Sequence, residues 1–535
     1  MTDISQQMPK YSPEFPVSAT DAFGHHLQVY ALSQPDKIAL IASERTTTWG
    51  ELVGKANRIA NQLRAMGLKP GDTVAALSET NAEFVALFLG TLIAGGCMVP
   101  LPGMVTADAL ARMINESLTR WLFVSRCQDN ILHELWYRLD RILPDCCIGL
   151  NYTPYTSGIS LDTWISDSDD TVRPAAVGPD APFNLIYSSG TTGTPKGILH
   201  DHRFRLRQIY HLTDYGLNGN AINLVSTPLY SNTTLISVLP TLYHGGTLVL
   251  MAKFEAREFL ALAQQHGVTH AMLVPTQFQR LLEQPDFDTF DLSAFKVKLS
   301  AGSPLRADVI RQVVARWPGE LKELYGLTEG GVATCLDCTA FPDKWDSVGK
   351  PVGITEVRII GDNGRELLPG QIGEIVGRSG AMMRGYFGRE EQTHDILWTS
   401  PEGKIFFRTG DVGRLDKDGF LYILDRLKDV IISGGLNVYA SDLERVLFEH
   451  PLVSDVAVIG IPSEKWGETP LALVVPKPGA GVASETELLT WANARLGRNQ
   501  RLTAVEYIDD LPRSPMGKLL KKDLRALYQR QPPPI

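Results

Sequence analysis

Several features that assign a protein to a class at first sight are scarce in this sequence. Its 535 residues contain six cysteines, and no second pair stands at zinc-finger spacing from Cys335 and Cys338. We therefore expect free thiols, as in a reducing compartment. The first residues, MTDISQQMPKYSPEF, lack the basic and then apolar pattern of a signal peptide, so we expect a cytoplasmic protein.

Basic runs are missing as well. The chain has 51 lysines and arginines against 60 aspartates and glutamates, so its formal net charge is −9. No cluster of positive charge has the form of a nucleic-acid footprint. The acidic residues are spread along the chain, which favours solubility and points to no special partner.

One apolar run, residues 82–101, approaches the length of a membrane span. It contains Glu83, and Gly95 and Gly96 interrupt its second half. We therefore expect a buried helix up to Ala94, then a turn and a short strand, and no integral membrane segment.

Helical and strand-like patterns alternate through the rest of the chain. Thr48 and Glu51 form a capping-box pattern before a helix that Gly67 ends, and Thr73–Leu77 is typical of a strand. The same order of helix, turn and strand returns at residues 255–275. This alternation predicts an α/β protein with layered, largely parallel sheets.

The length of the chain exceeds what one core usually supports, so more than one domain is expected. After about residue 350, short β-rich runs separated by Asp-Asn-Gly and Pro-Gly turns indicate a β-rich subdomain. Further on, Ser441 and Glu444 predict a second capping box at the start of a helix. We predict a large domain at 1–427 and a small, mobile α+β domain at 428–535, with the final QPPPI disordered.

The segment Tyr187–Gly197, YSSGTTGTPKG, is the most informative part of the chain. Its glycines let backbone N–H groups approach a ligand, its hydroxyls add donors, and Lys196 adds a positive charge. This composition suits a polyphosphate. Because Lys196 stands between Pro195 and Gly197, the P-loop pattern GxxxxGK[ST] is not met.

Four further motifs carry groups that suit a nucleotide and an acid. In YGLTE, Glu329 is a candidate Mg²⁺ ligand, and Thr328 is a candidate phosphate donor. The carboxylate of Asp411 in RTGD suits the two hydroxyls of a ribose. The glycines of DRLKDVIISGG suit a thin ligand, and Lys518 in PRSPMGK suits developing negative charge. Taken singly, each of these is an ordinary turn or surface segment.

Together with the small-residue turn SAGSPL, these motifs occur in an order that resembles the AMP-forming acyl-CoA synthetases, whose relatives include peptide-synthetase adenylation domains and luciferases. The resemblance extends from about residue 25 to 527. It implies a large N-terminal domain and a small domain that rotates between two steps. A carboxylate attacks the α-phosphate of ATP, with Mg²⁺ assisting, and gives acyl-AMP and pyrophosphate. The thiol of coenzyme A then attacks the acyl carbon and AMP leaves.

The resemblance also implies individual roles. The phosphate loop comprises Ser188, Ser189, Gly190, Thr191, Thr192, Gly193, Thr194 and Lys196. The residues on the nucleoside side are Gly302, Ser303, Pro304, Tyr325, Gly326, Asp411, Arg426 and Asn437, the last in place of a glutamine found in plant coumarate ligases. Thr328 contacts phosphate and Glu329 binds Mg²⁺. Lys428 is the hinge, Gly434 and Gly435 line the pantetheine path, and Lys518 serves adenylation but not thioester formation.

The sequence departs from the family near Pro228. Many members have an aromatic-histidine pair there, whereas this chain reads Leu229-Tyr230-Ser231 and has serine at the histidine position. A standard aryl or fatty-acid pocket is therefore in doubt, and the lack of an aspartate disfavours amino acids. The acyl-pocket candidates are Tyr230, Ser231, Asn232, Thr276, Ala301, Gly331, Val332 and Ala333. The small Gly330-Gly331 pair is expected to leave volume for an aryl, alicyclic or medium- to long-chain acid.

Three readings stay open at this point. The first is a CoA ligase, and the second is an adenylating enzyme that loads the thiol of a separate carrier protein. The third is a non-catalytic binding protein on the same fold, which the intact Lys196, Glu329 and Lys518 argue against. A monomer or a homodimer is expected, with a small carboxylic acid, ATP and CoA as ligands.

Overall fold

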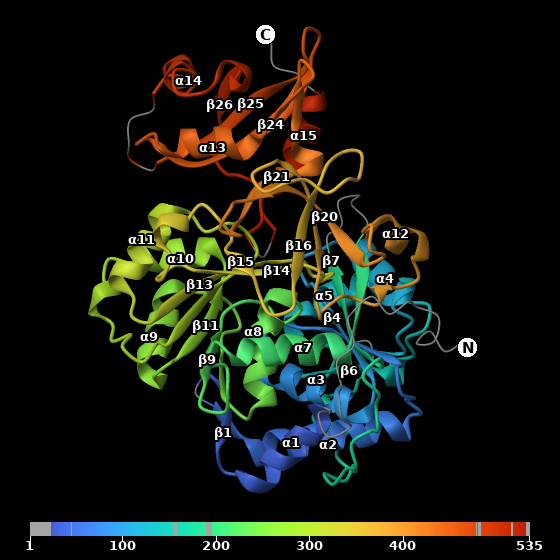
Figure 1. Ribbon diagram of the computed structural model, residues 1–535. Helices are drawn as coiled ribbons and strands as arrows, with labels where there is room; N and C mark the ends of the chain where they lie inside the picture. The colour runs from blue at the N-terminus through green and yellow to red at the C-terminus, as the bar shows by residue number, and fades with distance from the viewer. Residues whose placement is uncertain are drawn as a thin grey trace. The chain divides into compact units, whose positions relative to one another are not determined.

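The computed structural model describes residues 23–530, except 44, 155–157, 189–194, 478, 480–482 and 515–516. The chain divides into two compact units, each interrupted in sequence (Figure 1). The first comprises Met1–Trp345, Pro351–Glu356 and Gly377–Phe407, and the second comprises Asp346–Lys350, Val357–Val376 and Arg408–Ile535. The domain boundary expected at 427/428 stays a prediction.

The first unit contains a largely parallel sheet in the strand order β14-β13-β12-β11-β9-β10-β1-β2. The pairs from β13 to β1 are parallel, whereas β14 pairs with β13 and β2 pairs with β1 in antiparallel register. The strands are β1 (Ile38–Ala42), β2 (Arg45–Thr48), β9 (Ile222–Val225), β10 (Thr247–Leu250), β11 (His270–Leu273), β12 (Val297–Ser300), β13 (Glu320–Gly326) and β14 (Ala333–Asp337), and the short β15 (Lys350–Pro351) follows in the chain.

A second sheet of this unit has the order β18-β8-β7-β4-β3-β5-β6. It is parallel from β7 to β6, whereas β8 and β18 are antiparallel. Its strands are β3 (Thr73–Leu77), β4 (Cys97–Leu101), β5 (Trp121–Val124), β6 (Cys147–Gly149), β7 (Pro182–Ser188), β8 (Lys196–Asp201) and β18 (Gly385–Tyr386). The two sheets confirm the expected α/β layers.

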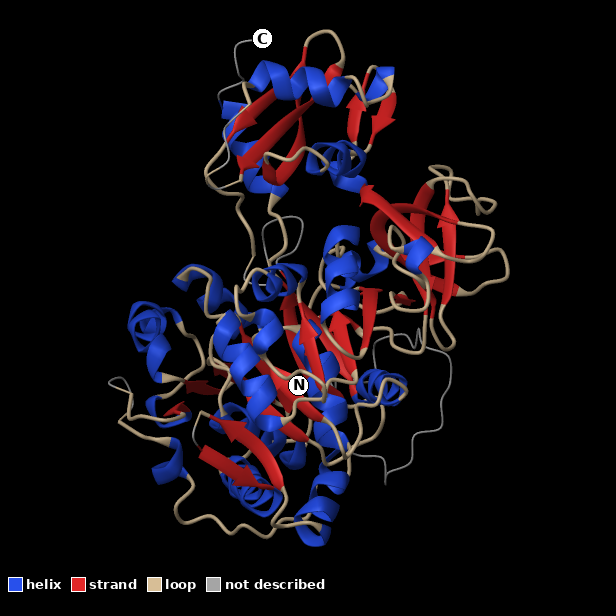
Figure 2. Ribbon diagram, turned by 90° about the vertical axis from the view of Figure 1, so that its left-hand side faces the viewer, coloured by secondary structure: helices blue, strands red, loops and turns tan. Residues whose placement is uncertain are grey.

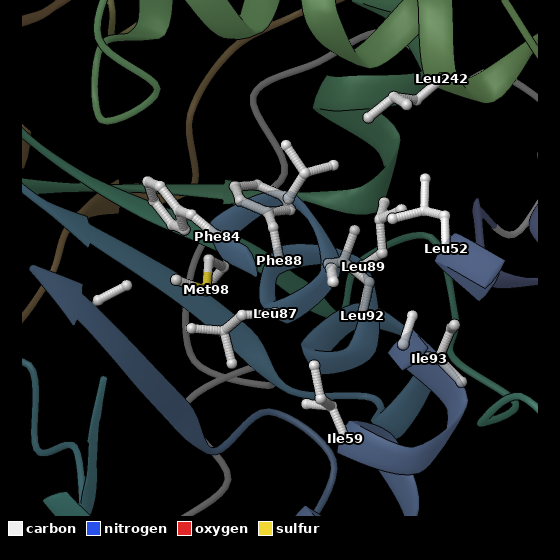
Figure 3. Close-up of a cluster of buried hydrophobic side chains, with 14 of the residues drawn as sticks. Leu52, Ile59, Phe84, Leu87, Phe88, Leu89, Leu92, Ile93, Met98 and Leu242 are labelled. Carbon is white, nitrogen blue, oxygen red and sulfur yellow. The ribbon is translucent and has the colours of Figure 1, made fainter. Parts of the chain in front are cut away.

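Helices cover these sheets (Figure 2). They are α1 (Phe23–Ser33), α2 (Trp49–Ala65), α3 (Ala82–Ala94), α4 (Ala107–Glu116), α5 (Asp129–Leu135), α6 (Leu161–Trp164), α7 (His202–Thr213), α8 (Asn232–Tyr243), α9 (Ala256–His266), α10 (Pro275–Leu282), α11 (Ala307–Arg316) and α12 (Glu390–Asp395). One buried apolar cluster takes side chains from α2, α3, α8 and strands of both sheets (Figure 3). Burying such side chains contributes most of the stabilisation of a fold.

Local signals explain the first helices. The Thr48 hydroxyl accepts from the Glu51 amide, and the Glu51 carboxylate accepts from the Thr48 amide, so the predicted capping box is present. Helix α3 ends at Ala94, Gly95 adopts a left-handed conformation, and β4 follows, as expected. Among the residues described, no helix combines the length and apolarity needed to cross a membrane.

A β-rich segment follows in the order β16-β17-β20-β19, with β21 paired to β20. Its strands are β16 (Glu356–Ile360), β17 (Gly373–Arg378), β19 (Leu397–Thr399), β20 (Ile405–Leu415) and β21 (Leu421–Arg426). This confirms the β-rich subdomain expected from the turn-separated runs after residue 350.

The C-terminal part of the second unit is an α+β layer. Its sheet has the order β23-β22-β25-β24, with β26 parallel to β25. The elements are β22 (Ile431–Ser433), β23 (Leu436–Val438), α13 (Ala440–Phe448), β24 (Val453–Ser463), β25 (Gly467–Pro476), α14 (Glu485–Asn493), β26 (Ala504–Tyr507) and α15 (Lys521–Arg530). The tail QPPPI lies outside the described residues.

The capping box predicted at Ser441 and Glu444 is wrong. Helix α13 begins at Ala440, so Ser441 already lies inside it, and its hydroxyl donates to the Leu424 carbonyl. The helix N-terminus is capped from outside, because the Asp425 carboxylate accepts from the Ala440 amide at 2.7 Å. Glu444 instead accepts from the Val458 amide at 2.8 Å.

Candidate functional site

The predicted phosphate loop joins the antiparallel strands β7 and β8, where Ser188 stands opposite Lys196. Ser189, Gly190, Thr191, Thr192, Gly193 and Thr194 lie outside the described residues. The exit of the loop is held by Arg389, which donates from Nη2 to the Pro195 carbonyl at 3.3 Å. The same guanidinium pairs with Glu116 at 3.0 Å. Both ends of the loop are therefore anchored in the second sheet.

A chain of contacts runs from this loop to the predicted metal ligand. The Lys196 amine lies 4.6 Å from the centre of the Tyr386 ring, and the Tyr386 hydroxyl donates to Glu329 Oε1 at 2.8 Å. Strand β18 places Tyr386 by pairing it with Ile198 of β8. Burial, and then the charge of Glu329, raise the pKa of Tyr386, so its hydroxyl stays a donor. Lys196 therefore lies at the ring of Tyr386 and Glu329 lies at its hydroxyl.

The turn after β13 carries Thr328 and Glu329, and its backbone is held at two carbonyls. The Thr328 carbonyl accepts from His200 Nε2 at 2.7 Å, and the Glu329 carbonyl accepts from the Met383 amide at 2.9 Å. Fixing the backbone leaves the Thr328 side chain and the second carboxylate oxygen of Glu329 to meet a ligand.

Close packing explains the two glycines that follow the turn. Gly330 has φ +77°, and a Cβ there would lie 2.1 Å from the Ala381 carbonyl oxygen. Gly331 has φ +81°, and its Cβ would lie 3.0 Å from that of Phe407. Close packing on the Cβ side therefore accounts for both glycines, and the volume expected beside them for an acid stays a prediction.

The small-residue turn expected to face adenine follows β12. Gly302 has φ +98°, Ser303 and Pro304 are accessible, and Ala301 is buried. Glu323 of β13 holds the end of the turn, because its Oε1 accepts from the Leu305 amide at 2.7 Å. Burial raises the pKa of Glu323 to about 8.

Tyr325 and Gly326 end β13 next to this turn in the same sheet. They stand opposite Thr334 and Ala333 of β14. Tyr325 is half-buried and Gly326 is exposed. Since β12 and β13 are parallel neighbours, their carboxyl ends carry the SAGSPL turn and the YGLTE turn at the same edge of the sheet.

The acyl-pocket candidates come from several elements. Tyr230 and Ser231 lead into α8, which Asn232 begins, and Thr276 lies in the first turn of α10. Ala333 begins β14, and Val332 precedes it. The Tyr230 hydroxyl is buried and has no hydrogen-bond partner among the described residues. Burial raises its pKa to about 12. Tyr230 is therefore a neutral donor at physiological pH.

In the second unit, the predicted ribose ligands face each other across two strands. Asp411 of β20 stands opposite Arg426 of β21, and Arg426 Nε lies 2.7 Å from Asp411 Oδ1. The Asp411 carboxylate is almost fully buried, whereas the Arg426 side chain keeps about a third of its surface exposed. Arg426 thus fixes one carboxylate oxygen of Asp411.

Lys518, near the C-terminus, interacts electrostatically with the same two residues, Asp411 and Arg426. The Lys518 amide donates to Ser514 Oγ at 3.1 Å, and the Lys518 carbonyl accepts from the Ser514 amide at 2.8 Å. The residue keeps solvent access, yet many protein atoms surround its amine. That partial loss of hydration, and then the positive charge of Arg426, lower the pKa of Lys518, while Asp411 opposes the shift. Lys518 therefore lies within electrostatic reach of both predicted ribose ligands.

The hinge candidate and the glycine pair lie nearby in the chain. Lys428 falls in a 3₁₀ turn, Leu427–Asp429, and loss of hydration lowers its pKa. Gly434 and Gly435 form the two-residue turn between β22 and β23, with φ +59° and +80°. Positive φ at both positions explains the two glycines without any ligand. Asn437 follows on β23 and is exposed.

The sequence reasoning missed Tyr386, Arg389 and His200. Tyr386 and Arg389 lie in RGYFGR, which carries no phosphate-loop pattern, and only the antiparallel pairing of β18 with β8 brings them to the loop. Tyrosine next to glycine in an apolar surrounding was the available signal. In the described residues no group of three or more His, Cys, Asp or Glu is placed to hold a metal ion.

Known proteins resemble this chain over most of its length. Residues 27–387 match the AMP-binding enzyme family, and residues 442–518 match the AMP-binding enzyme C-terminal domain. A fatty acid–acyl-carrier-protein ligase from Streptomyces coeruleorubidus is 32% identical over 94% of this chain and 98% of its own length. A feruloyl-CoA synthase from an Amycolatopsis species is 33% identical over 93% and 97%. ATP-bound MatB from Rhodopseudomonas palustris is 29% identical, with a TM-score of 0.85 over 95% of this chain and 99% of that one.

Proposed function

Because the chain belongs to the AMP-binding enzyme family, we propose that it is an ATP-dependent acid–thiol ligase that makes acyl-CoA through an acyl-AMP intermediate. The observation that carries the proposal is the contact chain from Lys196 through Tyr386 to Glu329 beside the phosphate loop. It supplies a cation, a phenol and a carboxylate where a polyphosphate is to be bound.

In the first step, an oxygen of the acid forms a bond to the α-phosphorus of ATP, and the bond to the pyrophosphate oxygen breaks. Negative charge accumulates on both sides of that phosphorus. We assign Lys196 and Thr328 to the phosphates, and Lys518 to the charge that develops between the carboxylate and the α-phosphate. Asp411 and Arg426 hold the ribose.

The residues present fit a Mg²⁺ ion that arrives with ATP. Glu329 uses Oε1 to accept from Tyr386, and its second oxygen takes no hydrogen bond from a described residue. Mg²⁺ is commonly held by one or two carboxylates together with substrate phosphates and water, so a single glutamate suffices. When bound, the ion neutralises charge on the leaving pyrophosphate.

In the second step, a thiol attacks the acyl carbon and AMP leaves with the bonding electrons. We assign CoA as the acceptor, supported by the 33% identity to a feruloyl-CoA synthase. The thiol of a separate carrier protein is the second candidate, supported by the 32% identity to an acyl-carrier-protein ligase. Aryl, alicyclic and medium- to long-chain acids are the proposed substrates.

The test measures pyrophosphate release from ATP and Mg²⁺ with benzoate, ferulate, cyclohexanecarboxylate, octanoate or palmitate, each with and without CoA. We expect one class of acid to stimulate release, and CoA to be needed for turnover and thioester. Stimulation by an acid without any response to CoA would favour the carrier-protein acceptor. No acid-dependent release would contradict the ligase proposal.

A further inference from the structure

Four buried polar side chains lie together behind the hairpin that carries the phosphate loop. They are Asn184 of β7, His200 of β8, Arg205 of α7 and Asn232 of α8, and none is more than 8% exposed. Arg205 lies at their centre. It donates from Nε to Asn184 Oδ1 at 2.7 Å and from Nη1 to Asn232 Oδ1 at 2.8 Å, and Nη2 lies 2.9 Å from His200 Nδ1.

No carboxylate is among the hydrogen-bond partners of Arg205 in the described part of the chain, because its remaining acceptor is the Gln208 amide oxygen at 2.6 Å. Burial lowers the pKa of Arg205 to about 9. Burying a cation among neutral groups is expensive, and an apolar residue would normally give a more stable core. Stability alone therefore does not account for this arginine.

The donors of Arg205 fix the direction of the hydrogen bonds that this side chain makes. An arginine has no acceptor, so His200 Nδ1 must accept, and the proton of its neutral ring stands on Nε2. That Nε2–H is the group that donates to the Thr328 carbonyl. Burial, followed by the charge of Arg205, lowers the pKa of His200 well below its usual value, which keeps the ring neutral.

The same logic orients Asn232. Its Oδ1 accepts from Arg205, so its Nδ2 is turned away as a donor, and this nitrogen makes no hydrogen bond to a described residue. Asn232 is one of the acyl-pocket candidates, and Thr328 is the phosphate candidate. A single guanidinium thus contacts one residue that touches the acid side of the reaction and, through His200, the backbone that carries the nucleotide side.

We propose that Arg205 is a positioning residue that fixes both the Thr328–Glu329 turn and the donor face of Asn232, and so aligns the nucleotide with the acid. The inference rests on the proposed function. It assigns the acid a hydrogen bond from Asn232 Nδ2, and it makes the KM values for ATP and for the acid depend on one buried cation.

The test uses steady-state pyrophosphate release with ferulate or octanoate, whichever the wild type turns over faster, and reads KM for ATP and KM for the acid separately. Arg205→Met and Arg205→Lys are expected to raise both KM values by about three- to tenfold. His200→Phe, which cannot donate to Thr328, is expected to raise the KM for ATP alone. Asn232→Asp, which keeps the acceptor for Arg205 and loses the donor, is expected to raise the KM for the acid alone.

Two controls separate positioning from folding. His200→Gln keeps a donor and an acceptor, so its KM for ATP is expected to stay close to the wild-type value, unlike that of His200→Phe. Arg203 lies on the same helix as Arg205, and Arg203→Met removes its ion pair with Asp180. This variant is expected to leave both KM values unchanged. Melting temperatures of all variants identify losses that come from unfolding. If Arg205→Met does not fold, Arg205→Lys is used instead, and the same rise in both KM values is expected.

The proposal is overturned if folded Arg205 variants keep both KM values within twofold of the wild type, or if they resemble Arg203→Met. It is also overturned if His200→Phe and Asn232→Asp each change both KM values equally, because the two branches would then not be separate. A wild type that releases no pyrophosphate with any acid would refute the proposed function instead, which keeps the two failures distinguishable.

Discussion

Tyr386 provides the sharpest test of the nucleotide side, because one ring makes two separable contacts. Its hydroxyl donates to Glu329 Oε1 at 2.8 Å, and its face lies 4.6 Å from the Lys196 amine. Tyr386→Phe removes only the first contact. Tyr386→Leu removes both and keeps an apolar side chain in a site that is 4% exposed.

The magnitudes follow from the kinds of contact. A hydrogen bond to a charged group contributes about 1.5–3 kcal/mol, so the lower bound corresponds to about a tenfold loss for Tyr386→Phe. Loss of the ring face adds about 0.5–1 kcal/mol, which is about a two- to fivefold further loss in Tyr386→Leu. We expect these losses in kcat/KM for ATP, since the proposed partners of Lys196 and Glu329 are the phosphates and Mg²⁺.

The assay is pyrophosphate release at saturating acid, with ATP titrated at high and at limiting Mg²⁺. Melting temperatures serve as the control for folding. The reasoning is refuted if Tyr386→Phe matches the wild type at both Mg²⁺ concentrations, or if Tyr386→Leu is no worse than Tyr386→Phe. In the wild type, the raised pKa of Tyr386 keeps the donor protonated through neutral and mildly alkaline pH, so this contact adds no alkaline loss there.

Three further outcomes are expected. Lys518→Ala should abolish acid-dependent pyrophosphate release, yet still convert supplied acyl-AMP to thioester; equal loss in both steps would contradict its assigned role. Lys428→Pro should spare pyrophosphate release and slow thioester formation, as seen by following both products in single turnovers; an unaltered overall rate would count against a hinge there. Gly330→Ala should lower the melting temperature well beyond Gly403→Ala, since both have φ near +78° but only Gly330 faces a carbonyl at 2.1 Å; similar losses would mean that the packing reason is wrong.

The sequence was enough to predict the elements whose signals are local. Thr48 and Glu51 stand three residues apart, so the hydrogen bonds of their capping box need nothing beyond the helix itself. Ser441 and Glu444 have the same spacing, and the prediction failed there. The carboxylate of Asp425, fifteen residues earlier, occupies the end of α13. A cap supplied by a distant strand leaves no mark in the helix sequence.

In the candidate site, too, the residues with local sequence signals could be predicted, and the contacts between distant segments could not. Short motifs of unusual composition contain Lys196, Glu329, Asp411, Arg426 and Lys518, so a role could be proposed for each of them from the sequence. The contacts that hold them could not. Tyr386 reaches Glu329 across 57 residues and His200 reaches Thr328 across 128, and these distances in sequence depend on sheet pairing.

The buried arginine also gives a physical context for the departure near Pro228. The family commonly has a histidine where this chain has Ser231, next to the asparagine that accepts from Arg205. An imidazole near a buried guanidinium that has no carboxylate among its hydrogen-bond partners in the described residues would be held neutral, as His200 is, or would add a second positive charge to the same region. Serine at this position brings no titratable group, and the Asn232 amide offers the guanidinium an acceptor without a charge. We therefore expect that replacing Ser231 with histidine lowers the melting temperature less when Arg205 is also replaced, and an equal loss in both backgrounds would contradict this reasoning.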